Sequence, residues 1–451
     1  MSQPTPLSGF PEWLPGERIV EQHVTDRLRE VFELHGFASV ETRAVEPLEQ
    51  LLRKGETSHE VYTLRRLQAA SDEETDAAST LALHFDLTVP FARYVLENAG
   101  TLSFPFRRYQ IQKAWRGERP QEGRYREFTQ ADVDVVDRDT LAFHHEIEIA
   151  QVIADAFARL PLAPLRLQVN NRKLIEGYYR GIGADDPAAV MRVVDKLDKI
   201  GAAGVAETLE REFKLSAEQG KACLALAEIT GTDSGFADRV TALGVSHPLL
   251  DEGLDELVRV VDATAELRSP SFSVVADLAV ARGLDYYTGT VYETRMQGFE
   301  RLGSICSGGR YDALASDGRT TYPGVGISFG VTRALGPLFA RRLVSASRST
   351  PTCVLVALPA DERRPDSAGV ATALRRRGIS TEVSPTAAKY GKQIRYAERR
   401  GIPFVWFPQD DGTHQVRDIR SGEQVDADPS AWVPPADDLR PTVSGTAATD
   451  A

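Results

Sequence analysis

An arginine-rich segment between two apolar stretches is the first part of this sequence that could do chemistry. Residues 116–126 carry four arginines, with glycines and a proline to shape a turn. Guanidinium groups bind phosphate through paired hydrogen bonds and keep their charge, so the segment predicts a polyphosphate-binding loop. Tyr125 and Phe128 supply rings on which a purine could stack. The alternative is a solvated charged turn.

Polar residues continue into the apolar stretch that follows this loop. Phe128, Gln130, Asp132 and Asp134 are spaced two residues apart, and such residues share one face of a β-strand. Carboxylates that are partly buried there need partners. A cationic ligand group, such as an amine or a protonated imidazole, would supply one.

Three glycine-containing segments further along the chain could also contact a ligand. Residues 282–290 place an arginine, an aspartate and two tyrosines beside two glycines, which predicts a polar pocket with aromatic walls or, alternatively, a turn with core tyrosines. Residues 306–312 predict a Gly-Gly turn where a ligand can approach the backbone. Residues 323–333 predict a strand leading into a helix. They match neither the GxGxxG fingerprint nor a P-loop.

Metal and nucleophile sites are not predicted. The adjacent His144 and His145 lie on an expected helix, where a structural role is commoner than zinc ligation. Cys223, Cys306 and Cys353 lack CxxC spacing and are expected to be free thiols. Cys306 has no paired histidine that would make it a nucleophile.

The elements that must position these residues follow from hydrophobic periodicity. A helix is expected over residues 17–35, and residues 172–267 show helical spacing throughout. Strands are expected over residues 37–42, 81–89, 108–115, 128–136, 273–280, 290–295 and 326–329. This pattern predicts a sheet-based core, residues 1–342, interrupted by a helical insertion.

A second, smaller domain is expected near the C-terminus. Residues 343–351 form a Ser-rich linker, and residues 352–433 alternate strands and helices, which predicts a small parallel-sheet α/β domain. Residues 434–451 are rich in Pro, Ala, Thr and Asp and are expected to be disordered.

The composition excludes some function classes. The 451 residues are 42% hydrophobic and carry a net charge of −12, which argues against a protein that coats nucleic acid indiscriminately but leaves selective RNA binding open. No apolar run approaches the roughly 18 residues of a membrane span.

At these residues the sequence resembles the class II aminoacyl-tRNA synthetases, and within them the histidine–tRNA ligases. Residues 116–134 resemble class motif 2, and residues 324–333 resemble motif 3. Residues 282–287 and 308–312 resemble the histidine-specific signatures RGLDYY and GGRYD, and residues 83–90 the amino-acid-binding strand. The resemblance extends to about residue 435. It implies an α+β catalytic core with an antiparallel sheet, and a C-terminal α/β anticodon-binding domain.

The resemblance implies a histidine site made mainly of polar side chains. Its residues would be Asp86, Leu87, Thr88, Arg116, Gln130, Asp134, Arg282, Tyr286 and Tyr287. Asp86, Thr88 and Gln130 would hold the α-amino group. Asp134 and Tyr287 would contact the imidazole.

It also implies an ATP site. Its residues would be Arg116, Glu118, Arg124, Phe128 and Arg333, with Glu118 and Phe128 facing the adenine. Arg116 and Arg282, the predicted catalytic residues, would hold the substrate carboxylate and the α-phosphate. Arg124 and Arg333 would reach the outer phosphates, with Mg²⁺ bridging them. The family commonly has a glutamate where Thr332 stands, so no metal ligand is predicted.

The implied activity is ATP-dependent formation of histidyl-adenylate and transfer of histidine to tRNA(His), by a cytoplasmic homodimer. In the anticodon-binding domain, Lys389, Lys392, Arg395 and Arg399 would form one basic helix face. One alternative is a non-catalytic, histidine-sensing regulatory subunit of ATP phosphoribosyltransferase. Such subunits typically lack the second domain. A tRNA-sensing pseudo-synthetase beside a kinase is the other alternative, and no kinase segment is present.

Overall fold

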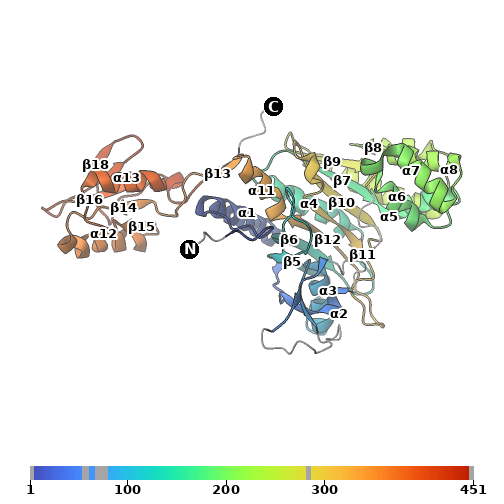
Figure 1. The fold of residues 1–451 in the computed structure, drawn as a ribbon, viewed down its shortest axis with the longest axis horizontal. Coiled ribbons are helices and arrows are strands. Elements are labelled where there is room, and N and C mark those ends of the chain that lie inside the picture. Colours follow the sequence, from blue (N-terminus) through green and yellow to red (C-terminus); the bar gives the residue numbers. More distant parts are fainter. Residues whose placement is uncertain (1–4, 53–59, 67–79, 281–285, 446–451) are drawn as a thin grey trace. The chain divides into compact units, whose positions relative to one another are not determined.

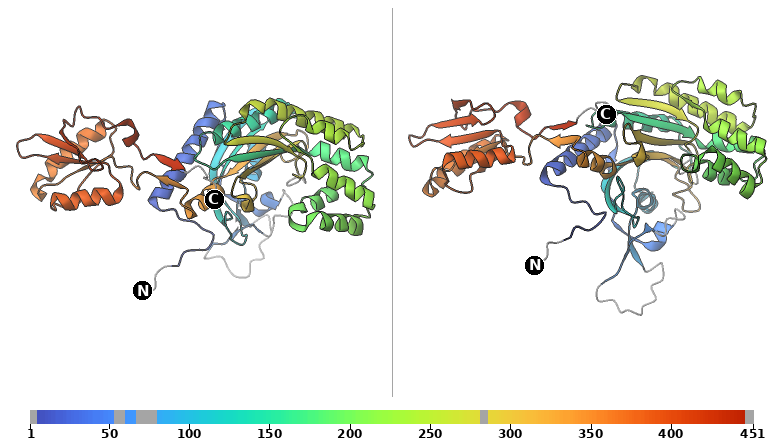
Figure 2. Two further views of the ribbon diagram at one scale, coloured as in Figure 1. Left: turned by 90° about the horizontal axis from the view of Figure 1, so that it is seen from above. Right: turned by 45° about the horizontal axis from the view of Figure 1, so that its top comes forward.

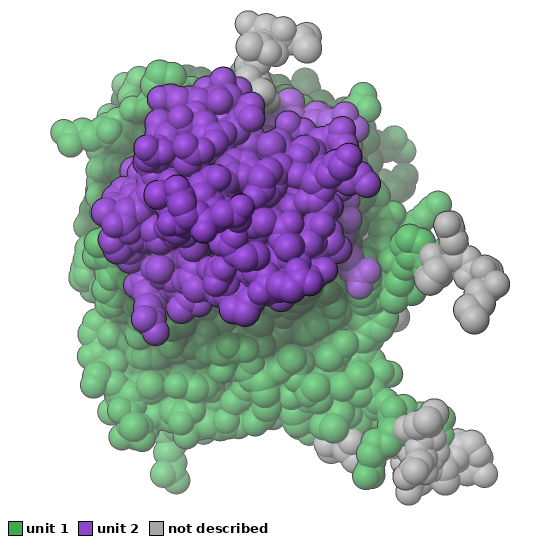
Figure 3. Space-filling model, turned by 90° about the vertical axis from the view of Figure 1, so that its left-hand side faces the viewer, with its two compact units in different colours: residues 1–11, 24–337, 447–451 green, residues 12–23, 338–446 purple. Residues whose placement is uncertain are grey.

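The computed structural model describes residues 5–52, 60–66, 80–280 and 286–445. The chain divides into two compact units (Figure 3). One comprises Met1–Pro11, Val24–Pro337 and Ala447–Ala451, and the other comprises Glu12–His23 and Leu338–Thr446. Among the described residues, no helix is long and apolar enough to cross a membrane.

The first unit is built on a nine-stranded sheet (Figure 1), in which the chain order is strongly rearranged. Across the sheet the strands are β1 (Ala38–Ser39), β5 (Phe106–Trp115), β6 (Glu127–Val136), β12 (Gly324–Gly330), β11 (Cys306–Tyr311), β10 (Thr290–Met296), β7 (Leu165–Asn171), β9 (Phe272–Asp277) and β8 (Thr230–Gly231). Only the pairs β1–β5 and β7–β9 are parallel. The expected antiparallel catalytic core is therefore confirmed.

Helices pack apolar residues against this sheet. On α1 (Pro15–Leu34), Phe32 lies 5.7 Å from the ring of Tyr109 on β5. On α4 (His144–Phe157), Phe157 meets Phe329 of β12 edge-on at 5.3 Å. Through these contacts, α1 and α4 cover one face of the central strands and bury its side chains.

Helices also occupy the interval predicted to be helical. They are α5 (Arg172–Gly181), α6 (Pro187–Val194), α7 (Leu197–Phe213), α8 (Ala217–Ala227), α9 (Phe236–Thr241) and α10 (Pro248–Ala263). They gather beside β7, β8 and β9 in both views of Figure 2. Helices α5 and α10 cross at glycines, because a Cβ on Gly177 would lie 2.2 Å from the Leu250 nitrogen and one on Gly253 would lie 2.1 Å from the Leu174 nitrogen.

Two predicted elements near the site are different in the structure. The strand expected over residues 81–89 ends early as β4 (Leu81–Leu83), and helix α3 (Thr88–Asn98) follows. The Asp86 carboxylate accepts a hydrogen bond at 3.1 Å from the Val89 N–H in the first turn of that helix. The Gly-Gly turn expected at residues 306–312 is instead strand β11, in the middle of the sheet.

The second unit contains a five-stranded sheet. Its strand order is β15 (Thr381–Val383), β14 (Val354–Val356), β16 (Phe404–Pro408), β17 (His414–Asp418) and β18 (Gln424–Asp426). Strand β14 is parallel to both neighbours, whereas β17 and β18 pair antiparallel, so the expected parallel sheet is mixed. Alternate residues of β14 pack against α12 (Arg364–Arg376) and α13 (Tyr390–Arg400), which therefore cover opposite faces.

The segments expected to be a linker and a disordered tail contain structure. Strand β13 (Val344–Ala346) pairs antiparallel with β19 (Val443–Gly445), and Ala436–Asp438 form a 3₁₀ turn. The expectation of disorder from residue 434 is therefore wrong for the described residues up to 445. Local composition does not predict this pairing, because the two strands are about a hundred residues apart in the sequence.

Candidate active site

Three neighbouring strands present aligned polar side chains on one face of the sheet. Strands β5, β6 and β12 are in register so that three cross-strand rungs form: Arg108–Asp134–Gly326, Gln110–Asp132–Ser328 and Gln112–Gln130–Gly330. We call this surface the polar floor. Residues opposite one another in antiparallel strands share a face, so backbone register alone brings these groups together.

The first rung holds a buried ion pair. Arg108 is fully buried and lies 2.7 Å from the Asp134 carboxylate, with its guanidinium 4.1 Å from the ring centre of Phe91. The Tyr311 hydroxyl donates to Asp134 at 2.9 Å. Glycine is required beside them, because a Cβ on Gly326 would lie 2.0 Å from an Asp134 oxygen. Asp134 is thus fixed and its charge is compensated.

The second and third rungs are joined by hydrogen bonds. The Gln130 Nε2 donates to the Ser328 hydroxyl oxygen at 2.7 Å, and the Ser328 hydroxyl donates to Asp132. Burial raises the pKa of Asp132 to about 7; Arg108 opposes this rise, the negative charge of Asp134 adds to it, and the hydrogen bond from Ser328 opposes it. The carboxyl of Asp132 therefore titrates near neutral pH.

An acidic pocket lies over the polar floor. Its lining is Asp86, Thr88, Arg116, Gln130, Asp132, Asp134, Tyr286, Tyr287, Ser307, Gly308, Tyr311, Gly326, Ile327 and Ser328. Thr88 begins α3 and Asp86 lies just before it, and the tilted rings of Tyr286 and Tyr287, with centroids 4.0 Å apart, form a wall. Burial raises the pKa of Tyr286 far above its usual value, so its hydroxyl stays neutral.

An arginine-lined pocket adjoins the acidic pocket. Its lining is Arg116, Glu118, Gly123, Arg124, Tyr125, Phe128, Gln130, Ser304, Ile305, Ser307, Ser328, Gly330 and Arg333. The two pockets share Arg116 and Gln130. The Arg116 guanidinium lies 5.1 Å from the ring centre of Phe128, and Arg124 donates to Glu118 at 3.0 Å. A negatively charged group in this pocket would face three guanidiniums.

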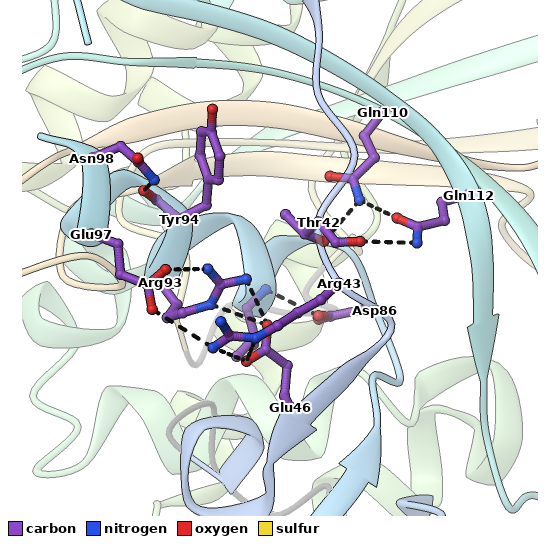
Figure 4. A network of polar contacts seen from close by, with 11 residues as sticks. Thr42, Arg43, Glu46, Asp86, Arg93, Tyr94, Glu97, Asn98, Gln110 and Gln112 are labelled. Atoms are coloured by element: carbon purple, nitrogen blue, oxygen red, sulfur yellow. Dashed lines mark hydrogen bonds and ion pairs between the residues drawn. The ribbon is translucent and has the colours of Figure 1, made fainter. Parts of the chain in front are cut away.

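A second polar network supports the elements that carry these residues (Figure 4). Glu46, which is almost completely buried on β2 (Val45–Pro47), pairs with Arg93 of α3 at 2.7 Å and with Arg43 at 3.0 Å. The Gln110 amide donates to the Thr42 hydroxyl at 3.0 Å. These contacts connect the segment before β2 to the polar floor and to the helix that begins beside Asp86.

The structure brings together most of the residues predicted for the site. Of the predicted set, Leu87 is fully buried and lines neither pocket. Arg282 lies outside the described residues. The Thr332 hydroxyl accepts the Thr129 N–H at 2.8 Å, so it is engaged within the protein.

Clustered metal ligands and an activated thiol were both looked for in the described part of the chain. It holds no group of three or more His, Cys, Asp or Glu side chains that could bind a metal ion. The three cysteines are free and buried. Burial raises the pKa of the Cys306 thiol well above its usual value, which disfavours the thiolate a nucleophile needs.

Sequence analysis missed the contribution of β5 and β12 to the floor. Arg108, Gln110 and Gln112 recur every second residue, the same period that identified the polar face of β6. The polar alternation of β5 was therefore visible in the sequence. Only the hairpin pairing of β5 with β6 shows that these residues lie on the same face as the polar residues of β6.

A largely antiparallel sheet that carries a polar amino-acid-sized pocket beside an arginine-lined one, together with a separate α/β unit, defines a class II aminoacyl-tRNA synthetase. Comparison with known families is more specific. Residues 9–334 match the family described as Histidyl-tRNA synthetase, and residues 352–433 match Anticodon binding domain.

Individual relatives agree with this match. The chain is 58% identical to the histidine–tRNA ligase of Micrococcus luteus, over 98% of this chain and 99% of that protein, and 57% identical to that of Cutibacterium acnes, over 99% and 100%. A crystal structure of histidyl-tRNA synthetase from Nostoc sp. PCC 7120 superposes with a TM-score of 0.83 at 34% identity, covering 95% and 97% of the two chains. The chain belongs to the histidyl-tRNA synthetase family. This membership favours the enzyme over the regulatory-subunit alternative.

Proposed function

We propose that the chain activates L-histidine with ATP to histidyl-adenylate and transfers the histidyl group to tRNA(His), releasing AMP and pyrophosphate. The observation that carries this proposal is the pair of adjoining pockets, one acidic and phenolic, the other cationic, which share Arg116 and Gln130. A zwitterionic amino acid placed in the first would direct its carboxylate toward the phosphates held in the second.

The acidic pocket suits histidine. Asp134, held by Arg108 and Tyr311, would contact the imidazole together with Tyr287, and Tyr286 would pack alongside. Asp86, Thr88 and Gln130 would receive the α-ammonium group. Because Arg108 and Tyr311 hold Asp134 before binding, this side chain would need little ordering when the substrate binds.

The arginine-lined pocket suits ATP. Phe128 and Glu118 would face the adenine, and Arg124 and Arg333 would hold the outer phosphates. The histidine carboxylate attacks the α-phosphorus, the α–β phosphoanhydride bond breaks, and pyrophosphate leaves; Arg116 stabilises the negative charge that develops. A ribose hydroxyl of the tRNA terminus then attacks the acyl carbon, and AMP leaves. We also assign Arg282 to the carboxylate and α-phosphate.

Mg²⁺ belongs to this proposal as a companion of ATP. Because the described residues offer no carboxylate cluster for a resident ion, the metal would be held mainly by phosphate oxygens, as Mg²⁺ often is. We further propose a cytoplasmic homodimer, with a catalytic domain of residues 1–342 whose helical insertion spans about 172–267, a linker at 343–351 and an anticodon-binding domain at 352–433. Light scattering would test the dimer.

The test of the activity is ATP–pyrophosphate exchange. The purified chain should incorporate labelled pyrophosphate into ATP only when L-histidine is added, and it should then load labelled histidine onto tRNA(His). Exchange without histidine, or with another amino acid in preference to it, would contradict the assignment. Exchange without transfer would leave the first step standing and refute the second.

A prediction for the second unit concerns α13. Lys389, Lys392, Arg395 and Arg399 are all exposed on this helix or at its N-cap. We expect Lys392→Glu combined with Arg395→Glu to raise the KM for tRNA at least tenfold and to flatten its salt dependence, because phosphate contacts release counterions. Histidine-dependent exchange should be unchanged.

The matched control for this prediction is Arg375→Glu combined with Arg376→Glu on α12, which removes the same number of positive charges from the same unit. An equal loss of tRNA affinity in the control would show that overall charge, rather than the α13 face, is responsible.

A further inference from the structure

Asp132 occupies the centre of the polar floor, yet the proposed reaction leaves it without a role. It lines the acidic pocket and is 2% exposed. Its neighbours in the rung are Gln110 on β5 and Ser328 on β12. A carboxylate buried to this degree is costly to ionise unless it is hydrogen-bonded or paired with a positive charge.

The hydrogen bonds around Asp132 have a defined direction. An ionised carboxylate only accepts hydrogen bonds, so the Ser328 hydroxyl must donate its proton to Asp132. The Ser328 oxygen is then left as an acceptor, and the Gln130 Nε2 donates to it at 2.7 Å. Asp132 therefore determines, through Ser328, which end of the Gln130 amide faces the serine.

The other end of this amide is available to a ligand. The Gln130 side chain is about nine-tenths buried, and its Oε1 accepts no hydrogen bond from any residue that the structure describes. Gln130 lines both pockets, and the proposed function places the α-ammonium group of the bound amino acid beside it. A buried carbonyl oxygen without a donor matches an ammonium group, which has three donors and no acceptor.

We propose that Asp132 is a positioning residue for substrate selection, which acts through Ser328 to hold the Gln130 carbonyl oxygen toward the α-ammonium group of histidine. This inference rests on the proposed function and adds residues to its amino-acid site. With the amide reversed, an N–H group would point at the positive charge. The hydrogen bonds from Gln130 through Ser328 to Asp132, which we call the relay, thus act at the amine end of the ligand and favour ligands that carry the amine.

The test compares two histidine analogues that separate the ends of the substrate. Histidinol keeps the amine and lacks the carboxylate, whereas imidazolepropionate keeps the carboxylate and lacks the amine. In Asp132→Asn, the new amide can donate to Ser328, and the relay can reverse. We expect the affinities for histidine and histidinol, measured by calorimetry, to fall roughly 10- to 100-fold, as for a lost hydrogen bond to a charged group.

Affinity for imidazolepropionate and the KM for ATP should stay within about twofold of wild type. Ser328→Ala breaks the relay while leaving Asp132 in place and should show the same selective loss. Asp137→Asn, just beyond the end of β6, is the control and should bind all ligands normally. Equal weakening of both analogues, weakening of imidazolepropionate alone, or no change would each overturn the inference.

Measuring binding directly keeps this test separate from that of the proposed function. A wild-type chain that binds histidine but shows no exchange would refute the activity, and the two analogues would still decide the role of Asp132. A wild-type chain that binds no histidine would overturn both.

The pH dependence gives a second readout. The charged and titratable groups around Asp132 are Arg108 on β5, Asp134 on β6, Cys306 on β11, Asp86 before α3 and Tyr286 in the pocket wall. Because the raised pKa of Asp132 is about 7, its carboxyl becomes protonated as the pH falls below that value and can then donate. The affinity of wild type for histidinol should therefore decrease below pH 7 more steeply than that of Asp132→Asn. Titration of the ligand's own imidazole is the same in both proteins.

Discussion

Arg116→Ala is expected to reduce the rate of histidyl-adenylate formation about 10²- to 10³-fold, the usual loss for a single strong donor to developing charge. Arg116 lines both pockets, and its Nε donates to the Phe85 carbonyl at 3.0 Å, which holds the guanidinium where they meet. Single-turnover formation of the adenylate, followed by rapid quench, measures this step without contributions from product release.

Arg119→Ala is the matched control for this prediction. Arg119 belongs to the same loop, is exposed and lines neither pocket. It should leave the rate within about twofold of wild type. If both variants lost activity equally, the loop would contribute general positive charge, and the assignment of Arg116 to the reacting phosphate would be refuted.

Arg108→Met is expected to lower the free energy of unfolding of the first unit by about 3–5 kcal/mol, because it leaves the Asp134 carboxylate buried without its cation. Arg108 is completely buried and Asp134 is 3% exposed, so water cannot replace the lost partner. Urea unfolding monitored by amide protection of β5 and β6 reports on this region alone.

Two further variants test the cause of that loss. Arg108→Met combined with Asp134→Asn should recover a large part of the stability, because no buried charge then remains unpaired. Arg107→Met, the neighbouring position, removes a pair with Glu148 in which both side chains are about a quarter exposed. It should cost about 1 kcal/mol or less. Similar losses at positions 107 and 108 would contradict the explanation.

The part of the fold that was predictable from sequence is the part determined by local pattern. The helix at α1, the hairpin of β5 and β6, and the alternation of strands and helices around α12 and α13 all have periodicities that extend over many residues. Their observed bounds differ from the predicted ones by a few residues. The family was also identifiable, because several separate motifs agreed.

The elements that sequence analysis misassigned are determined by partners far along the chain. Strand β11 was interpreted as a turn because Gly308 and Gly309 are turn formers in isolation. In the sheet, a Cβ on Gly308 would lie 2.1 Å from the Gly326 carbonyl oxygen, so the same glycines permit close packing of β11 on β12. The pairing of β13 with β19 was not predicted because these two strands are also far apart in the sequence.

The candidate site was predictable in its residue types and only partly in its geometry. The alternation at Gln130, Asp132 and Asp134 indicated a polar strand face, which the structure contains. The compensation of Asp134 by Arg108 depends on the register of two strands, and the hydrogen bond between Ser328 and Asp132 joins residues 196 positions apart. Sequence spacing contains no information on either contact.

That separation in the chain bears on how the pocket is completed during synthesis. Two of the three strands of the polar floor, β5 and β6, are joined by a short loop. They can therefore pair soon after residue 136 leaves the ribosome. The third strand of the floor is β12, and closing the long stretch of chain between β6 and β12 is slow. Until residue 330 has emerged, Asp132 lacks the hydrogen bond from Ser328. A nascent chain therefore cannot bind histidine as the finished protein does, however early the hairpin folds.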